Sequence, residues 1–272
     1  MKHTGSSDYT YLKLFMFLLL FSGLFCSQKI IKNTDIYGED YYENISAENA
    51  SMLRASLHKK ISNHVRFTYR EVWTILMDTD RDPEKKDNVM LIYSGKSIPA
   101  EHNNGVDSNN KDYWNREHVW PKSHGFKKKS TVPFTDVHHL KPADRTVNSS
   151  RGNKDFDFSD HPHREAKDTK IDSDSFEPAP AVRGDVARIL FYMDVRYEGN
   201  NGEPDLILVD HVKTSGSELG KLCTLLIWHH EDPVSPFERR RNDRIYFYQK
   251  NRNPFIDHPE WADLLWKEKC SH

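Results

Sequence analysis

The sequence predicts an α+β fold in which a mainly helical single domain surrounds a small antiparallel sheet. Several segments place apolar residues at helical spacing, whereas only short segments carry strand signals. Hydrophobic residues make up 36% and aromatic residues 12% of the 272 residues, which is enough apolar area for a packed core. We therefore expect a globular chain.

Helical periodicity defines the expected helices. They cover residues 47–62, 69–77, 182–197, 216–230, 236–248 and 259–267. The helix at 236–248 is crowded with arginine. The helices at 182–197 and 216–230 are expected in the core, because each carries an apolar stripe: Val186, Ile189, Leu190 and Met193 in the first, and Leu219, Leu222, Leu226 and Ile227 in the second.

The strand signals are short. Residues 90–93 form an apolar run before a polar loop at 98–111, and 114–121 is expected to be extended before a basic loop at 122–133. Residues 135–140 alternate as in a strand, with a stop at Pro142. A helix can begin at Asp144, a candidate N-cap, and 151–180 is expected to be irregular.

The N-terminal segment resembles a secretory signal. An apolar run at 14–25 follows Lys2 and Lys13, and its twelve residues are too few to span a bilayer, which needs about 20. We assign residues 1–27 to a signal peptide, with an uncleaved anchor as the alternative, 28–40 to a linker and 41–268 to the domain. We expect a secreted, periplasmic or extracellular monomer with no stable membrane partner.

Removing the leader leaves Cys223 and Cys270, with or without Cys26. In an oxidising compartment this pair would suit one disulfide, and two buried free thiols are an equal alternative. A bridge would enclose 48 residues (270 − 223 + 1) and stabilise the fold by about 4 kcal/mol in the chain-entropy model.

The charge of the chain gives no strong indication of its partner. The net charge is −2 and the pI is near 6.7, so the molecule lacks the positive field of a general nucleic-acid binder. Basic residues nevertheless cluster at 127–129, 183–188 and 239–244. Each cluster could steer a polyanion, although a solvated face is the commoner explanation for any one of them.

Polar and titratable residues gather in three segments where an ordinary strand would be apolar. Residues 114–123 contain Glu117 and His118, 136–142 contain His138 and His139, and 147–153 contain Asn148. Hydrolysis of a phosphodiester needs an activated water, neutralisation of charge on the phosphate oxygens and help for the leaving oxygen. This combination of side chains can supply all three.

Each of these side chains suits one part of the reaction. Mg²⁺ prefers oxygen ligands and keeps several waters, so the Glu117 carboxylate and the Asn148 amide oxygen suffice to hold it against a phosphate. His118, with an ordinary pKa of about 6.5, would stay off the metal and take a proton from water. Glu117 and His118 are adjacent, so the strand must end or bulge there. On the following helix Arg145, Asn148 and Arg151 share a face.

Two interpretations of a different kind remain open from the residues alone. One is a zinc-stabilised binding protein using the histidines at 138, 139, 161, 163, 229 and 230, although no convincing paired spacing supports it. The other is a module that binds nucleic acid through its arginine-rich helices without cleaving it. Intact Glu117, His118 and Asn148 argue against the second.

The chain resembles the endonuclease I family, a branch of the ββα-metal (His-Me finger) nucleases. The resemblance is carried by Asn-Arg-Glu-His-Val-Trp-Pro-Lys-Ser at 115–123, Asp-Val-His-His-Leu-Lys-Pro at 136–142 and Val-Asn-Ser-Ser-Arg-Gly-Asn at 147–153. Blocks at 183–188, 232–242 and 251–259 continue it, so that it covers about 41–266. Several blocks in order are far more specific than one motif.

The resemblance implies a ββα-metal catalytic motif and non-specific cleavage of DNA, RNA or both to 5′-phosphate ends. It implies that Glu117 and Asn148 bind one Mg²⁺, which Mn²⁺ or Ca²⁺ could replace, that His118 is the general base and that Arg151 steadies the phosphate. His138 is expected to be structural. The residues that we expect to support the site or bind substrate are Arg116, His138, His139, Arg145 and Asn153.

Overall fold

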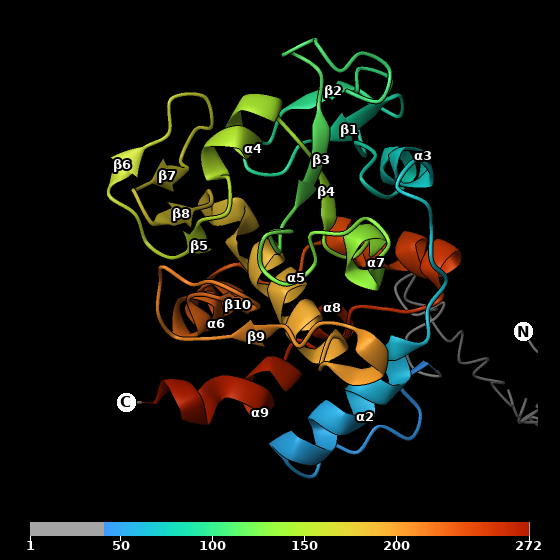
Figure 1. Ribbon diagram of the computed structural model, residues 1–272, viewed down its shortest axis with the longest axis vertical. Coiled ribbons are helices and arrows are strands. Elements are labelled where there is room, and N and C mark those ends of the chain that lie inside the picture. Colours follow the sequence, from blue (N-terminus) through green and yellow to red (C-terminus); the bar gives the residue numbers. More distant parts are fainter. Residues whose placement is uncertain (1–40, 272) are drawn as a thin grey trace, which may run out of the picture. The chain divides into compact units, whose positions relative to one another are not determined.

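The computed structural model describes residues 41–271. The expected signal at 1–27 and linker at 28–40 lie outside the described residues. The helices are α2 (Ala50–Ser62), α3 (Glu71–Thr79), α4 (Arg145–Arg151), α5 (Arg183–Arg196), α6 (Leu222–Glu231), α7 (Pro236–Gln249), α8 (Pro254–Asp257) and α9 (Trp261–Trp266) (Figure 1). This part of the chain is mixed α+β, as expected.

The strands between these helices are short and form small sheets. They are β1 (Asn88–Met90), β2 (Ser97–Pro99), β3 (Asn115–His118), β4 (Leu140–Ala143), β5 (Asp155–Phe156), β6 (His161–Pro162), β7 (Lys170–Ile171), β8 (Ser175–Glu177), β9 (Ile207–Leu208) and β10 (Glu218–Leu219). β1 pairs with β2 and β3 with β4, both antiparallel, β9 and β10 are parallel, and β5-β8-β7-β6 form one sheet.

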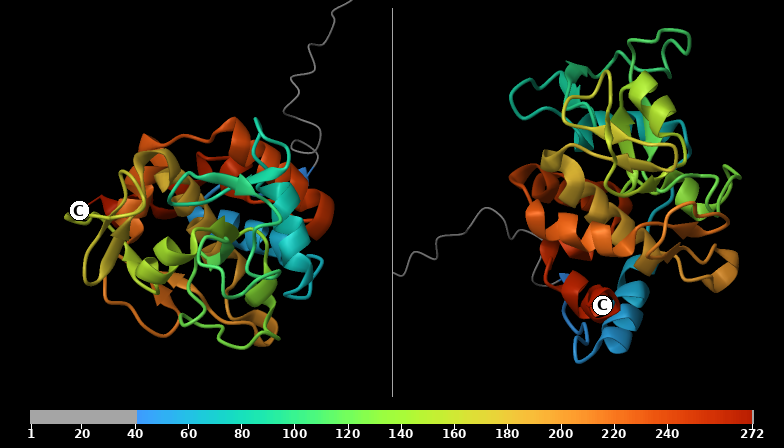
Figure 2. Two further views of the ribbon diagram at one scale, coloured as in Figure 1. Left: turned by 90° about the horizontal axis from the view of Figure 1, so that it is seen from above. Right: turned by 90° about the vertical axis from the view of Figure 1, so that its left-hand side faces the viewer.

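Helix α5 is the centre of the core and packs against α2, α6 and α8 (Figures 1 and 2). Every residue from Val186 to Arg196 is buried, including the apolar stripe that predicted a core helix. The buried Arg188 pairs with Glu238 of α7 at 2.6 Å, which satisfies its charge inside the protein. In α6 the predicted stripe is buried at Leu222 and Leu226, whereas Ile227 is 46% exposed.

The six expected helices are confirmed with shifted ends, although the helix expected at 216–230 begins only at Leu222, because 218–219 form β10. The strand expected at 135–140 and the irregular stretch expected at 151–180 are wrong. Residues 132–135 form a 3₁₀ helix, and the strand begins later, at Leu140, and includes Pro142. Pro142 is tolerated in this two-stranded sheet because its neighbour β3 needs no N–H from it. The stretch 151–180 is not irregular throughout, since it forms β5 to β8.

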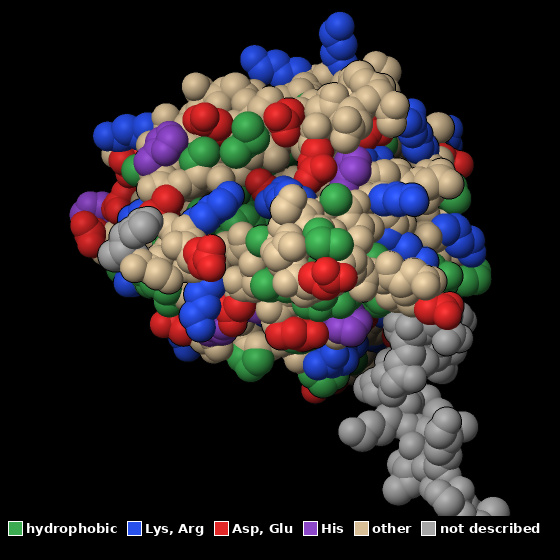
Figure 3. All heavy atoms as spheres, turned by 90° about the horizontal axis from the view of Figure 1, so that it is seen from below, with side chains coloured by type: hydrophobic (Ala, Val, Ile, Leu, Met, Phe, Trp, Pro, Cys, Tyr) green, Lys and Arg blue, Asp and Glu red, His purple; other side chains and the backbone are tan. Residues whose placement is uncertain are grey.

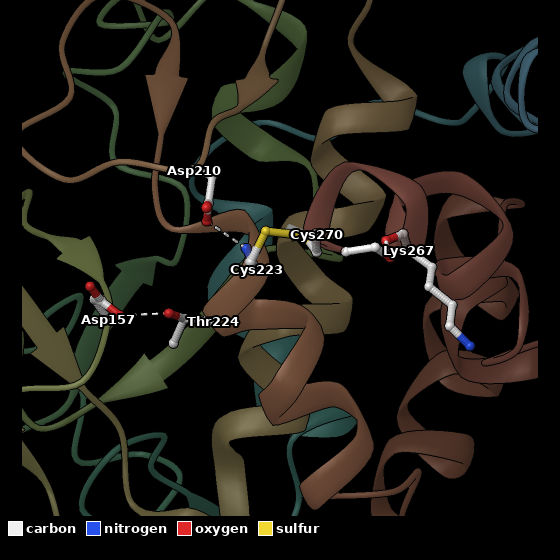
Figure 4. Close-up of a disulfide and its surroundings, with 7 residues drawn as sticks. Asp157, Asp210, Cys223, Thr224, Lys267 and Cys270 are labelled. Carbon is white, nitrogen blue, oxygen red and sulfur yellow. Dashed lines mark hydrogen bonds between the residues drawn. A yellow bond between two sulfur atoms is a disulfide. The ribbon is translucent and has the colours of Figure 1, made fainter.

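A disulfide joins Cys223 at the start of α6 to Cys270 near the C-terminus, with 5.4 Å between the Cα atoms (Figure 4). Asp210 accepts a hydrogen bond from the Cys223 amide at 2.9 Å, and Asp157 accepts one from the Thr224 hydroxyl at 2.6 Å. The bridge decides between the two alternatives that the sequence left open. It fastens the C-terminal segment to a core helix.

Replacing both cysteines by serine is expected to lower the free energy of unfolding by about 4 kcal/mol, because the unfolded chain is no longer constrained by a loop of this length. Urea unfolding of the double variant, with the reduced parent protein beside it, measures the change. An unchanged midpoint in both samples would show that the bridge does not restrain the unfolded chain.

Among residues 41–271, no helix has the length and apolar character required to cross a bilayer. On the face shown in Figure 3, acidic and basic side chains are interspersed rather than gathered by sign. This arrangement agrees with the near-neutral net charge.

Candidate active site

The site is built on the antiparallel pair β3 and β4 and on the helix α4 that follows β4. The register places Glu117 opposite Lys141 and His118 opposite Leu140. Asp144 caps α4 by accepting a hydrogen bond from the Thr146 amide at 3.1 Å, as expected. Gly152, with φ of 62°, ends α4 directly after Arg151, in a conformation that glycine adopts at little cost. These two caps define where α4 begins and ends beside β3.

An open pocket of about 610 Å³ lies where β3 ends. The four residues of β3 line it together with Asn148 and Arg145 of α4, Lys122 and Ser123 of the following loop, and Tyr69 and Trp73. β3 ends at His118, so the adjacent Glu117 and His118 both reach the same pocket. The structure thus brings Glu117, His118 and Asn148 together.

Glu117 is held by one of its two oxygens. Its Oε1 accepts hydrogen bonds from the Tyr93 hydroxyl at 2.9 Å and from Nη1 of Arg151 at 3.1 Å. Neither of these two hydrogen bonds involves Oε2. Burial raises the pKa of Glu117 above its usual range, while the charge of Arg151 and the Tyr93 hydrogen bond oppose that change. The hydrogen bonds from Tyr93 and Arg151 therefore orient Oε1, and Oε2 remains available to a ligand in the pocket.

His118 is a buried, neutral imidazole with a defined orientation. Its Nε2 lies 3.0 Å from the carbonyl oxygen of Phe134. A carbonyl only accepts, so Nε2 carries the proton and Nδ1 carries the free electron pair. Burial, and then the neighbouring His139, hold the pKa of His118 well below its usual range. The ring is thus kept in the unprotonated state that a general base requires.

Asn148 is half-buried on α4, and its Nδ2 donates to Oδ1 of Asn115 at 2.8 Å. This hydrogen bond orients the amide and leaves Oδ1 as the atom free to accept. Asn115, the first residue of β3, was not among the expected site residues. The sequence could have indicated Asn115, because it belongs to the same block as Glu117 and His118.

Arg151 does not line the pocket, although the family resemblance implied that it steadies the phosphate. Its guanidinium is fully buried and donates to Glu117, to the His118 carbonyl at 3.1 Å and to the Val119 carbonyl at 2.6 Å. Arg145 and Asn148 line the pocket, whereas Arg151, one turn further, donates to Glu117 and His118 of β3. In this structure Arg151 holds β3 and Glu117 in place and has no free face for a phosphate.

Three cations line the pocket without a carboxylate partner among the described residues: Arg116, Lys122 and Arg145. The guanidinium of Arg116 stacks over Tyr69 at 3.3 Å and Trp73 at 3.9 Å from the ring centroids, and it donates to the Tyr69 carbonyl. Burial lowers the pKa of Arg116 to about 10. Lys122 is exposed at the rim. A partly buried guanidinium with no counter-ion favours an incoming anion.

The remaining expected residues lie in varied surroundings. His138 and His139 are buried outside the pocket lining, with Nε2 near the carbonyls of Asn251 at 3.3 Å and Pro133 at 2.7 Å. Burial lowers the pKa of each to about 4. Arg145 lines the pocket and donates to the Ser108 carbonyl at 2.9 Å. Asn153 is exposed and does not line the pocket.

The described residues contain no group of three or more His, Cys, Asp or Glu side chains arranged to hold a metal ion. Glu117 and Asn148 are one carboxylate and one amide. A cation held by this pair would take its other ligands from water and phosphate oxygens, which is the coordination that Mg²⁺ favours.

The profile of the endonuclease I family matches residues 49–260, which is most of the chain and includes every residue of the pocket. This chain belongs to the endonuclease I family. It is therefore a nuclease, a hydrolase of phosphodiester bonds. The match confirms the family that the three sequence blocks indicated.

Two curated relatives agree with this assignment. The chain is 49% identical over 230 residues to an extracellular ribonuclease of Bacillus amyloliquefaciens, and equally to an extracellular ribonuclease of Bacillus subtilis (strain 168). Each alignment covers 84% of this chain and 78% of the relative.

Proposed function

We propose that this endonuclease I family member is a secreted, non-specific endonuclease that cleaves RNA and DNA with the help of Mg²⁺ and leaves 5′-phosphate ends. One observation carries the proposal: a single pocket holds the free Oε2 of Glu117, the free Nδ1 of His118 and the oriented amide of Asn148. The names of the two relatives support secretion and RNA as a substrate.

The donor set fits a hard divalent cation. The hydrogen bonds from Tyr93 and Arg151 to Glu117 do not involve Oε2, and the Asn115 contact leaves the Asn148 oxygen free. These two residues would hold Mg²⁺, or Mn²⁺ or Ca²⁺ in its place. When bound, the cation would neutralise charge on the phosphate oxygens. The order β3, β4, α4 and this donor pair support a ββα-metal motif.

In the proposed reaction, His118 accepts a proton at Nδ1 from the attacking water. The water oxygen forms a bond to phosphorus and the P–O3′ bond breaks. The O3′ oxygen takes a proton from solvent and His118 returns its proton to solvent, so one water is consumed. The Phe134 carbonyl holds the ring through Nε2–H and stabilises it once it is protonated. Arg116 and Lys122 bring positive charge to the phosphate from the pocket wall.

A digestion assay tests the proposal. Single-stranded DNA, duplex DNA and RNA are incubated with the protein after chelation, and again after Mg²⁺ is restored. We expect no cleavage with the chelator, recovery with Mg²⁺, and products that a 5′-phosphate-dependent exonuclease can degrade. Cleavage that persists at high chelator concentration would overturn the role of the cation, and products with 3′-phosphate ends would overturn the direction of attack.

A further inference from the structure

A second pocket, of about 320 Å³, is lined by arginines that the proposed reaction does not use. Its lining residues are Asp78 near the end of α3, Arg81 just beyond it, and Arg240 and Arg244 of α7. It shares no lining residue with the active-site pocket. The α7 arginines belong to the basic cluster at 239–244 that the sequence singled out.

Positive charge in this pocket exceeds negative charge. Arg244 binds Asp78, with Nε at 2.8 Å from Oδ2, and Arg81 binds the other oxygen of Asp78 at 3.1 Å. Arg240 donates to the carbonyl of Arg81, and its Nε is buried with no hydrogen-bond partner. Three guanidiniums therefore share one carboxylate within the lining. An anion with several oxygens would satisfy the excess charge, as phosphates do with arginine clusters.

Nearby carboxylates are committed to other partners. Asp80 is buried between Lys141 at 2.5 Å and Arg241 at 2.9 Å. Asp82 accepts hydrogen bonds from the Ser97 hydroxyl and the Glu84 amide. Neither lines the pocket, so the excess of positive charge remains on the side open to solvent.

An exposed aromatic ring lies on the same face of α7. Phe247 is 58% exposed, with the guanidinium of Arg244 at 5.1 Å and Nζ of Lys250 at 5.4 Å from its ring centroid. Residues 240, 244 and 247 recur at helical spacing and form one stripe, whereas Arg241 and Ile245 point into the protein. Arginines that alternate with an exposed aromatic are the features that bind single-stranded nucleic acid.

Helix α3 connects this stripe to the active site. It packs against α7 (Figure 1). Trp73 of α3 lines the active-site pocket and Asp78 lines the arginine pocket. Five residues of helix correspond to about 7.5 Å along the axis. The two pockets therefore lie about this far apart along α3, on sides of the helix that differ by about 140°.

We propose that the outer stripe of α7 is a second binding site for the single-stranded substrate, in which Arg81, Arg240 and Arg244 hold a backbone phosphate and Phe247 stacks on a base. This inference rests on the proposed nuclease function. The site adds affinity for long substrates and takes no part in bond cleavage.

The test compares Arg240→Gln/Arg244→Gln with a matched control, Arg239→Gln/Lys59→Gln, which removes the same charge from exposed positions outside both pockets. Binding of a fluorescent 30-nucleotide RNA and of a trinucleotide is measured in chelator, so that no cleavage occurs. We expect the Kd for the 30-mer to rise roughly fivefold to tenfold in the first variant only, with a shallower dependence on salt. The preference for the 30-mer over the trinucleotide should shrink accordingly.

Other outcomes have defined meanings. Equal losses of RNA affinity in the two variants would show that only the net charge matters, and this result would overturn the proposed site. Titration with inorganic phosphate separates the sources of the anion: phosphate binding that disappears in the variant, with unchanged RNA affinity, would assign the pocket to free phosphate. Since binding is measured without cleavage, failure of the digestion assay with intact RNA binding would count against the proposed function alone.

Discussion

His118→Ala is expected to lower kcat for RNA by roughly 10²- to 10⁴-fold, which is the usual contribution of a general base. The physical reason is the loss of the Nδ1 electron pair that the Phe134 hydrogen bond presents to the pocket. The assay is initial-rate cleavage at saturating substrate and Mg²⁺. Added imidazole should restore part of the rate, because the cavity left by the ring can accept it.

The matched control is His229→Ala. His229 is also buried and its Nε2 lies 3.0 Å from a backbone carbonyl, that of Pro259, but it lies outside the active-site pocket. Both variants lose packing around a ring, so a loss of kcat that is confined to the His118 variant and responds to imidazole identifies the base. Near-normal kcat in a folded His118 variant would remove His118 from the mechanism.

Arg151→Ala is expected to destabilise the protein by about 3–5 kcal/mol, because it leaves the buried Glu117 carboxylate without its ion pair and two carbonyls without a donor. Urea unfolding measures the loss. Activity should fall as well, since Glu117 and the end of β3 lose their support.

The variant Arg116→Gln distinguishes the role of Arg116 from that of Arg151. Arg116 lines the pocket and has no carboxylate partner among the described residues, so its loss should raise KM and lower kcat with a much smaller change in unfolding free energy. Arg151→Lys should recover stability in part, because it restores the charge beside Glu117. If instead Arg151→Ala were stable and inactive while Arg116→Gln were fully active, Arg151 would be the residue that contacts phosphate.

Helices could be predicted from the sequence because their periodicity is local. The stripe in α5 and the caps of α4 depend on residues within a few turns of one another. The strands were predicted less well. Residues 135–140 alternate like a strand, yet His138 and Asp136 are buried in a polar network that includes Gln249 and Tyr192. That network joins segments more than 50 residues apart, and local pattern cannot encode it.

The sequence by itself determined the family and the candidate catalytic residues, because Glu117, His118 and Asn148 stand in ordered blocks with a defined chemistry. Only the tertiary structure decided which arginine faces the pocket. Arg145, Asn148 and Arg151 share a helical face by spacing, but β3 covers the last of them, so Arg151 is buried against Glu117 while Arg116 remains open. Helical spacing gives the direction of a side chain, whereas its exposure depends on what packs against it.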